Sequence, residues 1–509
     1  MKVPLTPLEF LTRAERIYGR LESIVDGDRR LTYATFAARA HRLAHLLRRE
    51  FDVQAGDRVA YLCGNTVELL EAYYGVLLPG AVLTPLNIRL AAAEFQFILD
   101  NCDARVLAVH PSFNDVAASL NARARLDLDA GYDDLLARQP ADAADPGPVD
   151  EDGVCELFYT SGTTGTPKGV MLTHRALHTH AVDSALTLGL VHRDVVLHTI
   201  PLFHVNGWGT PHYVTALGAT HVLLERFDAD RVLELIASEK VTRLSIVPTM
   251  ASALLLSEDL RLRDLSSLVQ VTVGGAPPGP ELMADLEDAF ACEVICGYGL
   301  TEAAPQLTKA TTLRSHDALP LAEQRRVRAT TGLPNVGVDA RVLADDDTEV
   351  PWDGETAGEI CVRSNHVMAG YWNRPEETAE ALRGGWLRTG DIATVDAEGY
   401  ITIVDRKKDL IISGGENISS VEVEKAVAAH PAVLEVAVVA MPHERWGEVP
   451  RAFVALKPGA EGVDADVLER WVRDRLAGFK VPKRFDFLPE LPKGGSGKIL
   501  KAELRKGAL

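Results

Sequence analysis

From about residue 30 onward, helix-type and strand-type hydrophobic patterns alternate along the chain. Phe36, Ala40 and Leu47 recur at helical spacing after Thr32, a residue type that favours the start of a helix. A glycine-aspartate pair breaks this pattern before the apolar run at 59 to 63, which reads as a buried strand. Repeated helix-to-strand steps of this kind predict an α/β fold with largely parallel sheets.

Further along the chain, two features indicate how it divides. The stretch from 140 to 153 is rich in Pro, Asp and Ala and is typical of a loop between subdomains. A new α/β pattern begins after residue 405, where Ser419 and Glu422 form a candidate helix cap ahead of the apolar strand at 434 to 441. The last hundred residues are therefore predicted to form a small α/β domain of their own.

The composition is that of a folded globular protein. Hydrophobic residues make up 47% of the chain and charged residues 25%, so neither disorder nor a fibrous repeat is expected. The 509 residues are too many for one ordinary hydrophobic core and predict at least two domains. The net charge of -19 argues against a nucleic-acid partner, because such proteins gather Lys and Arg on one face. An anionic nucleotide would therefore need a local binding site.

No segment is typical of export or membrane insertion. The first twenty residues lack the apolar core of a signal peptide. No run approaches the roughly 18 apolar residues of a membrane-spanning helix. We therefore expect a cytoplasmic protein without an integral membrane segment. Its cysteines are expected to be reduced, with Cys292 and Cys296 as buried thiols rather than metal ligands.

Residues 159 to 170 form the most specific local pattern. Glycines allow backbone amides to turn toward an anion, hydroxyl groups add hydrogen-bond donors, and a lysine supplies positive charge. The segment is not the usual P-loop, because Lys168 is not followed by Ser or Thr. A flexible linker is the alternative, which the strand-like runs on both sides disfavour. The predicted phosphate-binding residues are Thr160, Ser161, Gly162, Thr163, Thr164, Gly165 and Lys168.

This loop resembles the signature of the adenylate-forming superfamily of acyl-CoA synthetases, peptide-synthetase adenylation domains and luciferases. Segments similar to other family motifs follow in the family's order, at 274 to 279, 297 to 302, 386 to 391, 405 to 419 and 492 to 501. The resemblance implies a large N-terminal domain that binds AMP and the acyl group, a hinge and a small mobile C-terminal domain. In this chain the three parts would be residues 1 to 404, 405 to 409 with Lys408 as the pivot, and 410 to 509.

The implied activity is that of an ATP-dependent carboxylic acid:CoA ligase. Such an enzyme forms an acyl-AMP with release of pyrophosphate, and then a thioester of CoA with release of AMP. The same resemblance implies that Lys498 bridges the substrate carboxylate and the ATP α-phosphate, which Thr301 also contacts. Glu302 and Thr160 would bind Mg²⁺, because a carboxylate beside a triphosphate requires a cation between them.

The resemblance assigns the remaining nucleotide and CoA contacts as well. These are adenine contacts by Gly275, Ala276, Gly297 and Tyr298, ribose and phosphate contacts by Asp391 and Arg406, and a CoA passage beside Gly414 and Gly415. Gly494 departs from the family pattern, in which Thr or Ser is common at that position. The expected consequence is a looser loop before Lys498.

The segment from 202 to 209 resembles the acyl-pocket segment of the family. His204 is expected to close the pocket over the carboxylate and Trp208 to act as an aromatic gate, with Val205 and Asn206 beside them. A packed aromatic turn is the alternative interpretation. The segment has no Lys or Arg, which favours an apolar acyl group. Medium- or long-chain fatty acids are the preferred prediction, and aryl, short-chain or sulfur-containing acids stay open.

Other functions share this fold. An acyl-AMP ligase that serves a carrier protein and a luciferase-like oxygenase both stay open, because fold alone does not set the reaction. A non-catalytic nucleotide-binding relative would be expected to lack Lys498, Glu302 or Asp391, and the sequence has all three. The predicted partners are a carboxylic acid, ATP and CoA, and the sequence leaves a homodimer open.

Overall fold

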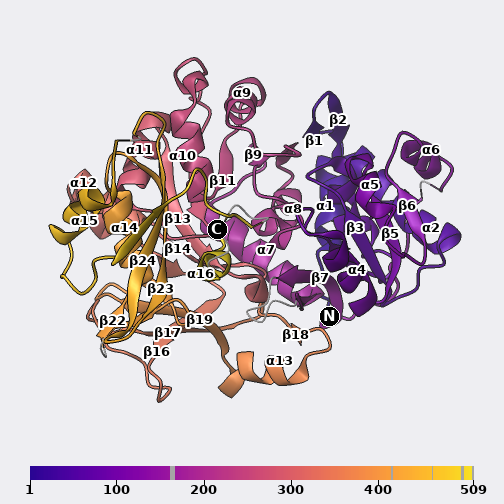
Figure 1. Cartoon of the computed structure of the whole chain (residues 1–509). Coiled ribbons are helices and arrows are strands. Elements are labelled where there is room, and N and C mark those ends of the chain that lie inside the picture. The colour runs from indigo at the N-terminus through magenta and orange to yellow at the C-terminus, as the bar shows by residue number, and fades with distance from the viewer. Residues whose placement is uncertain (141, 161–166, 414–415, 461, 495–497, 507–509) are drawn as a thin grey trace.

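The computed structural model describes the chain except for residues 141, 161 to 166, 414 to 415, 461, 495 to 497 and 507 to 509 (Figure 1). The described residues form two large sheets with helices packed between and around them, a smaller antiparallel sheet, and a C-terminal unit with its own sheet. The predicted α/β architecture is confirmed.

The largest sheet has a parallel centre and antiparallel edges. From β1 to β13 all six central strands are parallel neighbours, whereas β2, β14 and β15 pair antiparallel at the two edges. Its strands, in spatial order, are β15 (Leu333–Pro334), β14 (Gln306–Lys309), β13 (Glu293–Gly299), β12 (Gln270–Gly274), β11 (Arg243–Ile246), β9 (Val195–His198), β10 (Thr220–Leu223), β1 (Glu22–Asp26) and β2 (Arg29–Thr32).

The second large sheet is also mainly parallel, with an antiparallel pair at one edge. There β7 pairs antiparallel with β8, which pairs antiparallel with the short strand β18. In spatial order the strands are β18 (Gly370–Tyr371), β8 (Lys168–Thr173), β7 (Val154–Thr160), β4 (Val82–Pro85), β3 (Arg58–Leu62), β5 (Ala104–Val109) and β6 (Arg125–Asp127).

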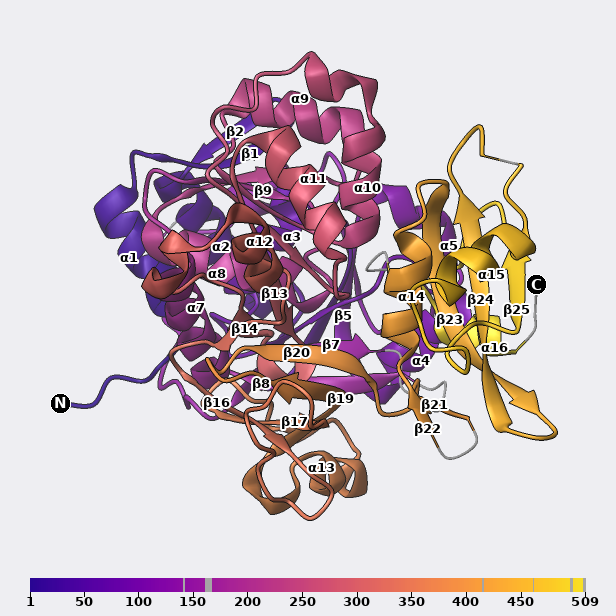
Figure 2. The ribbon, with the colours of Figure 1, turned by 90° about the vertical axis from the view of Figure 1, so that its left-hand side faces the viewer.

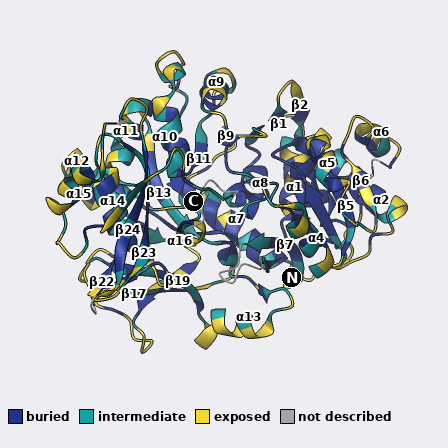
Figure 3. Cartoon of the chain, viewed as in Figure 1, coloured by how far each residue is buried: buried dark blue, intermediate teal, exposed yellow. Residues whose placement is uncertain are grey.

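Helices between the two sheets bury both of their inner faces. Figure 1 shows α7 and α8 between the strands β9 to β13 and the strands β3 to β7. All nine residues of α3 are buried, as expected for a helix with apolar neighbours on every side. The helices packed around these sheets include α1 (Leu8–Tyr18), α2 (Tyr33–Glu50), α3 (Val67–Gly75), α7 (His174–Leu188) and α8 (Val205–Leu217). Figure 3 shows the buried residues concentrated in these helices and the sheets they cover.

The remaining helices of this large body are shorter or lie toward the outside. They are α4 (Ala92–Asn101), α5 (Asn114–Ala117), α6 (Tyr132–Ala137), α9 (Ala229–Glu239), α10 (Pro248–Leu256), α11 (Pro280–Phe290), α12 (Leu321–Arg328) and α13 (Pro375–Ala381). A four-stranded antiparallel sheet completes the body, with the order β16 (Val338–Leu343), β17 (Gly358–Ser364), β19 (Leu387–Val395) and β20 (Ile401–Arg406).

The C-terminal unit begins after β20 and has a separate core. Figure 2 shows its strands and helices grouped at one side of the molecule. Its strands are β22 (Glu416–Ile418), β21 (Ile411–Ser413), β24 (Gly447–Leu456), β23 (Val433–His443) and β25 (Arg484–Phe487), and its helices are α14 (Ser420–Ala428), α15 (Ala465–Arg473) and α16 (Lys501–Arg505). Ile411, Val423, Val438 and Leu468 are among the side chains buried in this core.

Local sequence signals account for the helix starts. The Thr32 side chain accepts a hydrogen bond from the backbone N–H of Thr35 at the start of α2. Ser419 does the same for Glu422 at the start of α14, which confirms the predicted cap. The apolar run predicted at 434 to 441 lies within β23. No helix in the described part of the chain is both long and apolar enough to cross a membrane.

Candidate active site

Two glycine-containing segments lie side by side at the carboxyl edge of the largest sheet. Gly274 ends β12, and its register partner on the parallel strand β13 is Gly297. The approach is so close that a Cβ on Gly274 would lie 2.9 Å from the carbonyl oxygen of Gly297. In open parallel sheets, ligands bind outside the carboxyl ends of the strands. The predicted adenine segments, which include Ala276, thus meet where a flat ligand can approach the backbone.

The indole of Trp208 and the side chain of Lys498 converge on Gly275. Gly275 has a φ of 82°, and a Cβ there would lie 3.0 Å from Val247 Cγ1 and 3.2 Å from Lys498 Cε. The same Cβ would lie 3.6 Å from Trp208 Cζ2, and one on Gly274 would lie 2.8 Å from Trp208 Cη2. The predicted acyl gate and the predicted catalytic lysine therefore lie at one point, beside the predicted adenine segment.

The loop that carries Lys498 is tied to the large body. The guanidinium of Arg89 donates a hydrogen bond of 3.0 Å to the carbonyl oxygen of Gly494. The Gly494 N–H in turn donates to the Lys498 carbonyl oxygen at 2.8 Å. Residues 495 to 497 lie outside the described part of the chain. Sequence reasoning missed Arg89, since nothing in its surroundings in the sequence points to the lysine loop.

Opposing charges surround the Lys498 ammonium. Burial and the positive charge of Arg406 lower the pKa of Lys498 to about 8, while the carboxylates of Asp391 and Glu302 act in the opposite direction. Burial, assisted by the positive charge of Lys498, lowers the pKa of His204 to about 3, so this imidazole is neutral at pH 7. These five predicted site residues therefore share one electrostatic environment.

The predicted ribose contact, Asp391, is buried and held from two sides. The hydroxyl of Tyr298 donates to Asp391 Oδ2 at 2.7 Å, and Arg406 Nε donates to Asp391 Oδ1 at 3.1 Å. Asp391 and Arg406 are also register partners on β19 and β20. Each carboxylate oxygen has two lone pairs, so both oxygens can still accept a hydroxyl. The Tyr298 and Arg406 contacts with Asp391 were not foreseen from the sequence.

The phosphate segment begins in β7 and ends in β8. Thr160 and Lys168 are register partners, so the two ends of the segment lie opposite each other. Ser161, Gly162, Thr163, Thr164 and Gly165 lie outside the described residues. The Lys168 ammonium forms an ion pair with Glu377 and lies 5.3 Å from the ring centroid of Tyr371. Its predicted phosphate contact stays a prediction.

Tyr371 joins the phosphate segment to the predicted metal ligand. Its strand β18 pairs with β8, and its hydroxyl donates to Glu302 Oε1 at 2.9 Å. Burial and the negative charge of Glu302 raise the pKa of Tyr371, so the phenol stays a donor. Glu302 lies in the short 3-10 helix Thr301–Ala303, where Thr301 is buried. The sequence analysis did not single out Tyr371.

The donor types of Thr160 and Glu302 fit Mg²⁺. Carboxylate and hydroxyl oxygens are ligands that this hard cation accepts, together with water and phosphate oxygens. No group of three or more His, Cys, Asp or Glu that could hold a metal ion occurs in the described part of the chain. Burial raises the pKa of the Cys292 and Cys296 thiols to about 12, which disfavours thiolate chemistry there.

Lys408 lies in the turn between β20 and β21, at the entrance to the C-terminal unit. Residues on both sides of it contact helices of that unit: the hydroxyl of Ser420 in α14 donates to Asp405 Oδ1 at 3.0 Å, and Arg505 in α16 forms an ion pair with Asp409. Gly414 and Gly415 lie outside the described residues. The hinge at 405 to 409, the domain boundaries and the CoA passage stay predictions.

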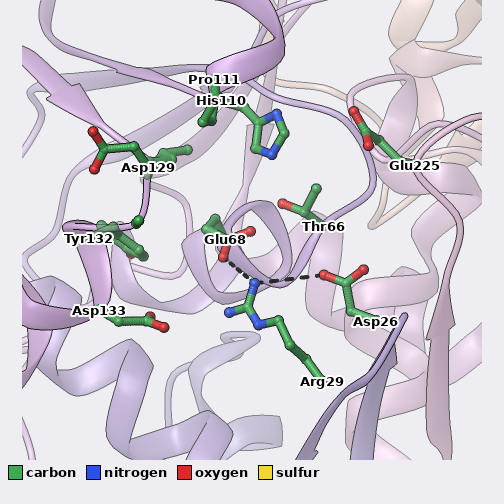
Figure 4. A pocket seen from close by; sticks show the side chains of 12 residues that line it. Asp26, Arg29, Thr66, Glu68, His110, Pro111, Asp129, Tyr132, Asp133 and Glu225 are labelled. Carbon is green, nitrogen blue, oxygen red and sulfur yellow. Dashed lines mark hydrogen bonds and ion pairs between the residues drawn. The ribbon is translucent and has the colours of Figure 1, made fainter.

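A separate cavity of about 370 Å³ lies away from these residues (Figure 4). Five of its twelve lining residues are acidic, and Arg29 pairs there with Glu68 at 2.6 Å and lies 3.9 Å from Asp26. None of the predicted site residues lines it. An acidic wall repels phosphates, so this cavity does not suit a nucleotide.

Comparisons with known proteins agree with this geometry. The family model described as AMP-binding enzyme matches residues 11–372, and the one described as AMP-binding enzyme C-terminal domain matches residues 422–498. A feruloyl-CoA synthase of Amycolatopsis sp is 41% identical over 97% of both chains. A 4-hydroxybutyrate–CoA ligase of Metallosphaera sedula is 35% identical over 99% of this chain and 94% of its own.

A solved structure shows the same architecture. The crystal structure of an anthranilate CoA ligase in complex with anthranoyl-AMP superimposes with a TM-score of 0.91. It is 27% identical in sequence, and the match covers 100% of this chain and 98% of that one. The fold with a large N-terminal and a small C-terminal part is thus that of adenylate-forming enzymes.

Proposed function

Because the chain belongs to the AMP-binding enzyme family and is an AMP-forming acid:CoA ligase, we propose that its substrate is a small aromatic carboxylic acid, of the cinnamate or benzoate type. The observation that carries this proposal is the 41% identity to a feruloyl-CoA synthase along 97% of both chains. The solved relative with anthranoyl-AMP also acts on an aryl acid.

The geometry around Trp208 supports a flat acyl group. The edge of the indole packs on the backbone at Gly274 and Gly275, and Val247 lies beside Gly275. An aromatic substrate ring can stack on an indole or meet it edge to face, which contributes about 0.5 to 1.5 kcal/mol beyond simple burial. The neutral His204 beside it adds no charge that would favour a second carboxylate on the acid.

The relatives favour the alternative of the sequence analysis over its first choice. The preferred prediction was a medium- or long-chain fatty acid, whereas the curated relatives reported above act on feruloyl and 4-hydroxybutyryl groups. The second of these makes a short hydroxy acid the runner-up. Both candidates are small acids.

Within this proposal, the described residues have distinct roles in the first half-reaction. An oxygen of the acid carboxylate attacks the ATP α-phosphorus and forms a new O–P bond. The bond between the α-phosphorus and the oxygen that bridges to the β-phosphate breaks, and pyrophosphate leaves with that electron pair. The Lys498 ammonium would neutralise the carboxylate and α-phosphate as they approach, and Asp391 would hold the ribose hydroxyls. Glu302 and Thr160 would hold Mg²⁺, which supplies charge neutralisation on the phosphates.

The second half-reaction transfers the acyl group to the CoA thiol. The thiol loses its proton to solvent and its sulfur attacks the acyl carbon; the bond from that carbon to the phosphate oxygen breaks, and AMP leaves with the electron pair. ATP and CoA are the co-substrates of such ligases, and rotation about Lys408 between the two steps is part of the proposal. We also expect the enzyme to act in the cytoplasm.

A panel of acids tests the substrate class directly. Purified protein with ATP and Mg²⁺ is supplied with ferulate, cinnamate, benzoate, anthranilate, 4-hydroxybutyrate, octanoate or palmitate, with and without CoA, and AMP and thioester are quantified. We expect kcat/KM for at least one aryl acid to exceed that for octanoate by tenfold or more, with AMP release dependent on CoA. Higher values for octanoate or palmitate would refute the aryl proposal and restore the fatty-acid prediction.

A further inference from the structure

The acyl segment has a backbone conformation that its residues do not favour by themselves. Five successive residues have positive φ: Val205 at 41°, Asn206 at 49°, Gly207 at 52°, Trp208 at 71° and Gly209 at 85°. Residues other than glycine are disfavoured in this left-handed region, and a β-branched residue such as valine is disfavoured most. Such a conformation persists only where the surroundings hold it in place.

The buried carboxylate of Glu156, in β7 of the second large sheet, binds this segment. Asn206 Nδ2 donates to Glu156 Oε2 at 2.8 Å, and His212 Nε2 lies 2.9 Å from Glu156 Oε1. The side chains of Glu156 and His212 are wholly inaccessible to solvent, and Asn206 is 1% exposed. A buried carboxylate is costly unless it is paired and hydrogen-bonded, so both contacts are needed to keep Glu156 there.

Glu156 also has a particular place along the chain. It lies in β7, the strand that ends at Thr160 and leads directly into the phosphate segment. Its two partners belong to α8, on either side of Trp208 and Gly209. The carboxylate therefore ties the acyl segment to the element that positions the phosphate segment.

Neighbouring contacts leave the segment little room elsewhere. The Thr210 hydroxyl donates to the Asn206 carbonyl oxygen at 3.2 Å. On the other side, a Cβ on Gly209 would lie 2.3 Å from His180 Cε1, so α7 presses directly on the backbone. Packing therefore holds the segment at Gly209, and the hydrogen bond from Asn206 to Glu156 holds it at its start.

We infer that Glu156 is a positioning residue for the acyl pocket, which holds Asn206 and thereby fixes where Trp208 and His204 meet the acid relative to the nucleotide. The inference rests on the proposed function only in taking the segment as the acid-binding wall. Without the Glu156 contact, the segment would relax toward ordinary φ values, and the acid would be bound less well and selected less strictly. Misplacement by about 1 Å can cost about 100-fold in rate.

The test compares acid and ATP dependence in full-length variants. Glu156→Gln keeps the shape but has one oxygen acceptor in place of two, so the amide cannot accept hydrogen bonds from both Asn206 and His212. We expect the KM for the best acid to rise 10- to 100-fold in the exchange of pyrophosphate into ATP, a range set by the cost of misplacement. The KM for ATP should stay within about twofold of wild type, and the ratio of kcat/KM between the best and second-best acid should fall.

Two further variants separate positioning from folding. Asn206→Gly removes the hydrogen bond from Asn206 to Glu156 itself, and glycine accepts a φ of 49° without strain, so this variant tests the contact without adding backbone strain. It should raise the acid KM similarly, and the double variant should be no worse than the more affected single variant. Glu71→Gln is the matched control, because Glu71 is equally inaccessible but bonds to Arg39 at 2.7 Å rather than to the acyl segment. It should change thermal stability alone.

Several results would overturn the inference. These are an acid KM and acid profile unchanged in both Glu156→Gln and Asn206→Gly, equal rises in the KM values for acid and ATP, and fully multiplicative effects in the double variant. Each ratio is measured with whichever acid the wild-type enzyme prefers. An aliphatic preference would therefore refute the proposed aryl substrate and leave the test of Glu156 intact.

Discussion

Replacing Lys498 by alanine should separate the two half-reactions of the enzyme. In the structure the Lys498 side chain lies against Gly275, and the charges of Arg406, Asp391 and Glu302 act on its ammonium, within the region where acid and nucleotide would meet. At an effective dielectric constant of about 20, a unit charge about 4 Å from an anion contributes about 4 kcal/mol. Solvent and neighbouring charges offset part of this value, so a loss of about 3 to 4 kcal/mol is expected, or about 10² to 10³ in rate.

The assay measures each half-reaction by itself. Acid-dependent exchange of labelled pyrophosphate into ATP reports the first, and thioester formation from supplied acyl-AMP and CoA reports the second. The exchange rate should fall about 10²- to 10³-fold, as for loss of one charge-stabilising group, while the second rate stays within about threefold. Lys493→Ala is the matched control, because this lysine lies in the same loop but pairs with Glu435 at 2.8 Å. Equal losses in both half-reactions would refute the assigned role.

The pH dependence provides a second check on the same residue. The Lys498 pKa of about 8 lies below the ordinary value because burial and Arg406 disfavour the charged form. Only the protonated lysine can neutralise the two anions, so kcat/KM for the acid should be high below pH 8 and fall as pH rises through it. The descending limb should be absent from the residual activity of Lys498→Ala, and its persistence would assign it to another group.

Three further substitutions test separate contacts. Gly275→Ala should raise the ATP KM about tenfold, because the new Cβ would lie 3.0 Å from Val247 Cγ1. Gly56→Ala is the control, because Gly56 also has a positive φ, of 84°, but has open space around it. Both variants should lose about 1 kcal/mol of stability from backbone strain, and Gly56→Ala should leave the ATP KM unchanged. Trp208→Ala should shift the acid profile more than the ATP dependence, as measured by kcat/KM across the acid panel. Tyr371→Phe removes the donor to Glu302, so the Mg²⁺ concentration for half-maximal exchange should change by about 10- to 100-fold, the size expected for one hydrogen bond to a charged group. An unchanged Mg²⁺ dependence would remove Tyr371 from the metal site.

The contacts of the lysine loop bear on the departure at position 494. Sequence comparison with the family pattern suggested a looser loop, since glycine stands where Thr or Ser is common. In the structure the Gly494 backbone makes hydrogen bonds to both Arg89 and the Lys498 carbonyl group. Position 494 uses only its backbone N–H and C=O in these two bonds, so neither bond requires a side chain at this position. The described part of the loop is thus held without the hydroxyl.

The sequence by itself determined the elements and the family. Helical spacing after Thr32, the cap at Ser419 and the apolar run at 434 to 441 are local signals, and each predicted element is present in the structure. The glycine-rich motifs in order also identified the family correctly, because their chemistry depends on residues that are neighbours in the chain.

Only the tertiary structure decided which distant residues touch. Tyr371 meets Glu302, and Arg89 meets Gly494, across separations of 69 and 405 residues, which no local pattern encodes. In the sequence, Glu156 is a charged residue within an otherwise mainly apolar strand. It acquires a partner only when β7 packs against α8, because the cost of burying a carboxylate is met by groups that the fold brings to it.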